Sequence, residues 1–170
     1  MALLVRKIDK GKWMQNDILR GEPISADAIT NCLKTKQNML SMWRIADRHD
    51  VDDVVLAQAS MFDHLDSIDV VILDEGSLRK RGIHIEDAPG GTRLADLADA
   101  HVHASGLDID LLCELATTIA DSLRSKNEQR YEKGTLARLL ASAISEERLQ
   151  LEELNEHVAE RVRKVLDATT

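Results

Sequence analysis

The stretch that decides the fold reads Asp-Val-Val-Ile-Leu-Asp-Glu at residues 69–75. Its consecutive aliphatic residues, bounded by acidic side chains, are typical of a short strand that is buried on both faces. Residues 3–8, 40–45 and, more weakly, 83–86 have a similar character, and helix-like segments lie between them. We therefore predict a small sheet of about three to four strands, with residues 40–45 and 69–73 at its centre and with some parallel pairing.

The apolar pattern changes to a helical one after residue 106. Aliphatic residues recur at helical spacing and predict a helix over residues 108–124. A second stripe then continues to the C-terminus, either as one bent helix or as two helices joined near Glu147. The predicted fold class is α+β, with a mixed α/β region at residues 1–105. An all-helical region at residues 106–170 follows it, packed on the first region or on a partner.

Composition limits the kind of protein further. The chain has 170 residues and 44% apolar content, enough to form a core without disulfides or metals. Its aromatic residues are two Trp, one Tyr and one Phe, too few for a surface on which nucleic-acid bases stack. Cys32 and Cys113 lie on apolar helical faces, so we expect both in the core of a cytoplasmic protein. No stretch approaches the roughly 18 apolar residues of a membrane helix, so we expect no membrane contact.

Charge is distributed unevenly along the chain. The total of −8 divides into +4 for residues 1–48, −10 for residues 49–127 and −2 for residues 128–170. An acidic protein is a poor general binder of nucleic acid, so only residues 1–48 are suited to contact phosphates. The acidic middle segment could instead face the basic head or act as a nucleic-acid mimic.

The string Asp99-x-His101-x-His103 is the candidate metal site. Alternate residues of a strand point to one side, so two imidazoles could reach one divalent metal ion. The string resembles the first metal-binding motif of the amidohydrolase superfamily, although that family's barrel needs roughly 250 residues. The alternative is that both histidines lie in a polar connection between the two regions. Convergence of His64 and His84 on them would favour the metal site.

The acids that end the 69–75 stretch form a second candidate site. Asp74 and Glu75 after four apolar residues resemble the Walker B strand of P-loop ATPases, where such acids hold magnesium and polarise the attacking water. The position of Asp74 also resembles the phosphoacceptor of response-regulator receivers. No Gly-x-x-x-x-Gly-Lys-Ser/Thr loop accompanies it. The structural alternative is that Asp74 or Ser77 caps a short helix over residues 77–81.

The stripe near the C-terminus is the candidate partner-binding surface. An apolar stripe on an acidic-faced helix often packs against a partner helix or a second copy of the chain. The residues predicted to form this surface are Leu151, Leu154, Val158, Val162 and Val165.

Two classes of function follow from these patterns. The first is a non-enzymatic interaction or regulatory protein, a small accessory or neutralising subunit of a cytoplasmic assembly of the toxin–antitoxin or defence-operon type. It needs no cofactor. The alternative is a metal-dependent hydrolase or phosphoesterase that uses Asp99, His101 and His103 with a divalent metal.

Overall fold

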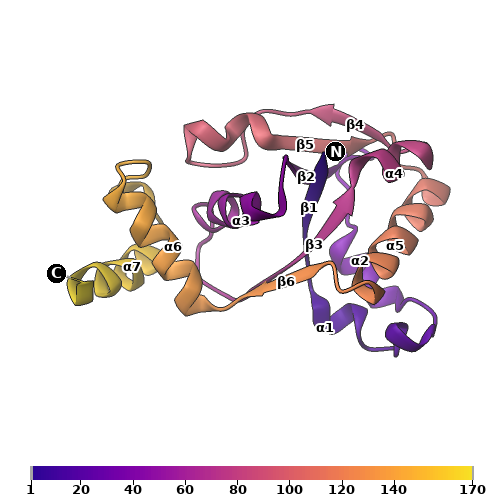
Figure 1. Cartoon of the computed structure of the whole chain (residues 1–170), viewed down its shortest axis with the longest axis horizontal. Coiled ribbons are helices and arrows are strands. Elements are labelled where there is room, and N and C mark those ends of the chain that lie inside the picture. The colour runs from indigo at the N-terminus through magenta and orange to yellow at the C-terminus, as the bar shows by residue number, and fades with distance from the viewer. Residues whose placement is uncertain (1, 170) are drawn as a thin grey trace.

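The computed structural model describes residues 2–169 and contains one six-stranded sheet in the order β4-β5-β2-β1-β3-β6 (Figure 1). Every neighbouring pair of strands in it is antiparallel. The strands are β1 (Leu3–Ile8), β2 (Leu40–Ile45), β3 (Ile68–Asp74), β4 (His84–Asp87), β5 (His101–Ser105) and β6 (Glu128–Tyr131).

The predicted sheet of three to four strands followed by an all-helical region is therefore wrong. β6 lies within the region expected to be helical and pairs with β3. β5 pairs with β2 and β4, although its residues are not among the predicted strands of the sheet and one of the two interpretations of its histidines is a polar connection. The expected parallel pairing is wrong for a topological reason. β2 and β3 do run in the same direction, but β1 lies between them and pairs antiparallel with both. The fold is α+β overall, with helices and strands interleaved along the whole chain.

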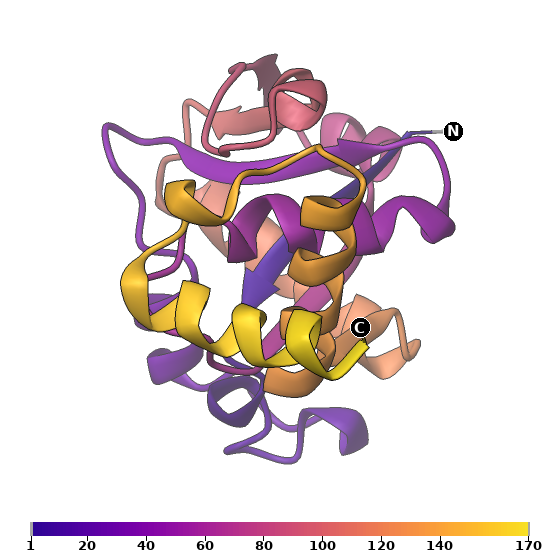
Figure 2. The ribbon, with the colours of Figure 1, turned by 90° about the vertical axis from the view of Figure 1, so that its left-hand side faces the viewer.

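Helices cover both faces of this sheet (Figures 1 and 2). One face carries α3, α6 and α7, and Figure 2 views the molecule with α6 and α7 in front. The other face carries α1, α2, α4 and α5. The bounds are α1 (Lys10–Trp13), α2 (Ala26–Cys32), α3 (Val51–Ala59), α4 (Glu75–Lys80), α5 (Ile109–Arg124), α6 (Lys133–Ser145) and α7 (Glu156–Thr169). Short 3-10 segments lie at η1 (Ile18–Arg20), η2 (Arg48–Asp50), η3 (Ala95–Ala100) and η4 (Leu151–Glu153).

β3 shows why its sequence is continuously apolar. Val70 and Ile72 belong to the core under α3, α6 and α7, whereas Val71 and Leu73 belong to the core under α5. Side chains alternate between the faces of a strand, so a strand with a core on each side needs apolar residues at every position. β3 thus contributes side chains to both cores, and its last residue, Asp74, is only partly buried.

The C-terminal stripe forms two separate helices, α6 and α7, joined by residues 146–155. Glu147 has a φ of +60° in this connection, close to the expected joint. Among residues 2–169 no helix has the length and apolarity that crossing a membrane requires.

Candidate functional site

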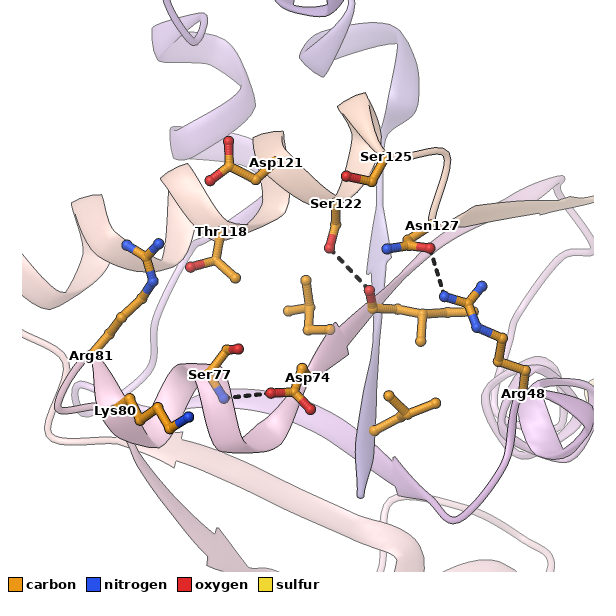
Figure 3. A pocket seen from close by; sticks show the side chains of 13 residues that line it. Arg48, Asp74, Ser77, Lys80, Arg81, Thr118, Asp121, Ser122, Ser125 and Asn127 are labelled. Carbon is orange, nitrogen blue, oxygen red and sulfur yellow. Dashed lines mark hydrogen bonds between the residues drawn. The ribbon is translucent and has the colours of Figure 1, made fainter. Parts of the chain in front are cut away.

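A cleft of about 660 Å³ lies where β3 ends, between α4 and α5 (Figure 3). Its apolar lining comes from Leu3, Ile72 and Leu73, at the end of the β1–β3 pair. Figure 3 shows Asp74, Ser77 and Lys80 on the α4 side, facing the polar side chains of α5. The cleft is large enough to hold a small metabolite.

Asp74 is one of two acids that line this cleft, and the other, Asp121 of α5, pairs with Arg124 at 3.0 Å. The Oδ1 of Asp74 accepts a hydrogen bond from the Ser77 backbone N–H at 2.6 Å and so caps α4. Its Oδ2 is buried without a hydrogen-bond partner. The predicted capping role is therefore confirmed for Asp74, but it uses only one carboxylate oxygen. A buried oxygen without a donor is costly, so the second oxygen is prepared to accept a hydrogen bond from a ligand.

Glu75, the second acid of the Walker B-like pair, has a different environment. It is buried and accepts hydrogen bonds from Arg44 Nε at 2.8 Å and from Arg79 Nη2 at 2.7 Å. Burial acts to raise the pKa of Glu75, but the hydrogen bonds and charges of the two guanidinium groups outweigh it and lower the pKa. Glu75 does not line the cleft. The two neighbouring acids thus do not act on one ligand, as the Walker B resemblance would require.

Three basic side chains surround the cleft, and two of them have no carboxylate partner among residues 2–169. Arg48 donates from Nη2 to the amide oxygen of Asn127 at 2.6 Å, and the side chain of Lys80 forms no hydrogen bond within residues 2–169. The third, Arg81, pairs with Glu114 of α5 and so links the two walls. Arg48 and Lys80 therefore retain charge that a bound anion can neutralise.

The α5 wall presents hydroxyl groups at helical spacing. Thr118 donates to the Glu114 backbone oxygen at 2.8 Å, and Ser122 donates to that of Ile72 at 3.1 Å. Ser125 lies one turn further along and also lines the cleft. The sequence reasoning missed this wall, although the hydroxyls at 118, 122 and 125 share one helix face. That spacing was the signal that could have indicated a polar cleft beside the aliphatic stripe.

Two of the three predicted metal ligands, His101 and His103, are neighbours on β5, and the third, Asp99, lies outside that strand. His101 Nδ1 lies 2.6 Å from the Ala88 backbone oxygen, and the rings of His101 and His103 are 5.1 Å apart. Burial and His101 together lower the pKa of His103. Asp99 lies in η3, before the strand that carries the histidines. No group of three or more His, Cys, Asp or Glu side chains suited to a metal occurs within residues 2–169, and the metal site stays a prediction.

The other two histidines of that hypothesis are elsewhere. His64 stacks on His157 of α7, with ring centroids 4.7 Å apart. His84 is exposed on β4 and pairs in register with Ser105. The four histidines therefore do not converge, and neither pair lines the cleft beside α5.

The predicted partner-binding residues pack inside the protein. Leu154, Val158 and Val162 are 7%, 0% and 0% exposed, and Leu151 and Val165 pack against the same core. In the folded chain this stripe thus belongs to the core that α6 shares with α3, and α7 packs against α6. The expectation for the two cysteines holds for Cys32, which is buried, but is wrong for Cys113, which is exposed. Cys113 lies on the outer side of α5, where the helical pattern alone does not separate core from surface.

Comparison with protein-family models, curated proteins and solved structures gives no match for this chain. The class of protein is therefore given by its architecture, an α+β protein with a six-stranded antiparallel sheet and a polar cleft at the end of β3. Any function must be argued from the side chains of the chain itself.

Proposed function

We propose that this chain is a non-enzymatic regulatory protein that binds a small phosphorylated polyol, such as a sugar phosphate, in the cleft between α4 and α5. The observation that carries the proposal is the buried, unpartnered Oδ2 of Asp74, a residue that lines the cleft together with Arg48 and Lys80, two cations without a carboxylate partner among residues 2–169. The proposal keeps the regulatory class inferred from the sequence and adds a ligand.

The distribution of charge supports this ligand class. A phosphate suits Arg48 and Lys80, because both side chains donate hydrogen bonds and carry charge that no carboxylate of the described residues 2–169 neutralises. A sugar hydroxyl suits Asp74, because an ionised carboxylate only accepts hydrogen bonds. The hydroxyls of Ser77 and Ser125 both donate and accept, so they complement further hydroxyls of the ligand. A ligand with an anion alone would leave Asp74 unsatisfied.

The position of the cleft supports a regulatory role. A ligand that contacts Lys80 on one wall and Ser122 on the other would connect α4 with α5. In the absence of a ligand, the Arg81–Glu114 ion pair connects these two walls, and its side chains are 38% and 48% exposed. An exposed ion pair contributes little to the stability of the arrangement of α4 and α5. A ligand that contacts both helices would therefore stabilise the arrangement in which it is bound.

A titration with D-ribose 5-phosphate tests the proposal. Backbone amide signals in two-dimensional NMR should shift at residues 74–81 and 118–127, with an affinity that calorimetry can measure. D-ribose and inorganic phosphate, the two halves of the probe, should each bind at least about tenfold more weakly. Absence of shifts at about 10 mM probe, or shifts confined to other parts of the chain, would overturn the proposal.

A pair of lysine variants locates the binding. Lys80→Ala should weaken D-ribose 5-phosphate at least about tenfold, because it removes an unpaired cation from the cleft. Lys34→Ala is the matched control, since Lys34 is also exposed but lies outside the cleft after α2. Equal effects of the two variants would indicate non-specific attraction and contradict the assignment.

A further inference from the structure

A second polar site lies where the sheet opens between β1 and β2. The two strands are paired at one end, where the last pair is Val5 with Trp43. Beyond it, β1 stays paired with β3 as far as Ile8, while β2 stays paired with β5 as far as Leu40. The sheet is therefore split at this end, and we call the gap between the strands the β1–β2 opening.

Arg6 fills the β1–β2 opening. Its Nη1 donates to the Ser41 backbone oxygen and its Nη2 to the Cys32 backbone oxygen, both at 2.8 Å. Its Nε is buried without a partner. The guanidinium thus bonds to neutral carbonyl groups, and burial lowers the pKa of Arg6. A desolvated cation with no counter-ion is costly in a folded protein, and an anion that reaches it gains an unusually favourable contact.

Lys7 adds a second cation beside the first. Its Nζ lies 4.5 Å from the centroid of the Phe62 ring. Lys7 is exposed as a whole residue, but partial burial of its ammonium group and then the charge of Arg6 lower its pKa. Asp66 acts in the opposite direction but is already paired with Lys133 at 2.8 Å. The two neighbouring cations therefore share no dedicated counter-ion.

These cations line a cavity of about 350 Å³ on the α3 side of the sheet, and we call it the Arg6 cavity. Its lining is largely apolar and includes Val5, Trp43 and Phe62. Phe62 and Trp43 offer aromatic surface to a planar ligand, and such surfaces pair favourably with another ring. An apolar cavity with charged groups at one side fits a ligand that is itself apolar at one end and anionic at the other.

His101 contributes a hydrogen-bond acceptor to the Arg6 cavity. Its Nδ1 lies 2.6 Å from the Ala88 backbone oxygen, and because a carbonyl can only accept, Nδ1 carries the proton. In the neutral ring Nε2 is then an acceptor. A Cβ placed on Gly91 would lie 3.5 Å from this nitrogen, so the glycine leaves the space beside it open. His101, a candidate metal ligand by sequence, is thereby placed to accept a ligand hydroxyl.

We propose that the Arg6 cavity binds a small hydroxylated aromatic carboxylate. The carboxylate would lie against Arg6 and Lys7, the ring beside Phe62 and Trp43, and the ring hydroxyl would donate to Nε2 of His101. This site is separate from the cleft beside α5 and shares no lining residue with it.

Three related probes test the proposal: 6-hydroxy-2-naphthoate, its neutral amide 6-hydroxy-2-naphthamide, and 2-naphthoate, which lacks the hydroxyl. Calorimetry should show the first binding at least about tenfold more tightly than the amide, and several-fold more tightly than 2-naphthoate. Binding should also change the fluorescence of Trp43, which lines the cavity. Equal affinities for the carboxylate and the amide would overturn the proposal.

Two glutamine variants separate the cavity from the rest of the surface. Lys7→Gln should weaken 6-hydroxy-2-naphthoate about tenfold and leave the amide unaffected. Lys34→Gln, a matched exposed lysine away from the cavity, should change neither affinity. An excess of D-ribose 5-phosphate should not displace the naphthoate, so failure of this site and failure of the α5 cleft are distinguishable. Equal losses in both variants would contradict the assigned position.

Discussion

The two ends of β1 are each flanked by a polar site, and the two sites hold their charged side chains in different ways. At one end Asp74 lies opposite Leu3, caps α4 with one oxygen and leaves the other buried without a partner. At the other end Arg6 bonds to backbone oxygens of two separate segments through both terminal nitrogens. Asp74 therefore supports one short helix, whereas Arg6 holds together the β1–β2 opening. The difference implies that a substitution of Asp74 can weaken ligand binding without unfolding the protein, whereas a substitution of Arg6 changes ligand binding and stability together.

The largest expected effect is on stability at Arg6. Arg6→Met should lower the free energy of unfolding by about 3 kcal/mol, because it leaves two backbone oxygens without their donors, that of Cys32 in a partly buried place and that of Ser41 at an exposed one. Urea denaturation followed by circular dichroism measures the change. Arg6→Lys can restore one of the two hydrogen bonds, so it should lower the free energy of unfolding by less than Arg6→Met does. A loss below about 0.5 kcal/mol for Arg6→Met would remove the contrast with Asp74.

A smaller loss of stability is expected at Glu75. This residue sharpens the comparison because it follows Asp74 in the sequence, whereas its carboxylate is paired with two arginines. Glu75→Gln should destabilise the protein by about 2 kcal/mol at pH 7, since it weakens the bonds from Arg44 and Arg79. The folded-state pKa of Glu75 is lowered, so its contribution is present above the unfolded-state value. It is lost as the pH falls through the folded-state value. The difference between wild type and variant in urea should therefore shrink in acid; an equal difference at pH 7 and pH 3 would contradict the assigned ion pairs.

At Asp74 the expected change is smaller and of opposite sign. Asn is as good an N-cap as Asp, so Asp74→Asn keeps the α4 cap and replaces a buried, charged oxygen that has no partner by a neutral amide group, whose burial costs less. The variant should be as stable as wild type or more stable by up to about 1 kcal/mol, while its affinity for D-ribose 5-phosphate falls. Thermal unfolding and calorimetry on the same sample measure both quantities. A marked loss of stability would mean that Asp74 is a structural residue.

Strands that contribute several large apolar side chains to the cores are predictable from the sequence, and strands with few such side chains, as β5 and β6, are not. Residues 3–8 and 40–45 form β1 and β2 because their apolar residues fill the two cores. β6 reads Glu-Gln-Arg-Tyr and buries only Tyr131, so its place depends on hydrogen bonds to β3. The order of the strands is equally hidden, since nothing local indicates that β1 enters between β2 and β3.

The same limit applies to the functional residues. The cap at Asp74 is a local signal and can be predicted, but its unpartnered oxygen depends on how α4 is placed at the end of β3. The stripe that includes Val158 is correctly read as apolar. An amphipathic pattern states that a face is buried but not whether its own core or another chain buries it. His101 carries a local signal for metal binding, yet its surroundings place it beside Arg6 and Trp43.

The smallest expected effect on stability is at Lys7, and it decides whether function can be separated from structure at the Arg6 end as well. Lys7 is exposed and its recorded contact is with the face of Phe62 at 4.5 Å, so Lys7→Gln should change the free energy of unfolding by no more than about 0.5 kcal/mol. Since the loss of naphthoate affinity is expected to be about tenfold, binding would then depend on the free cation while the β1–β2 opening depends on Arg6. Urea denaturation of Lys7→Gln beside Arg6→Met measures this directly. Similar losses of stability in both variants would show that the two cations act as one structural unit.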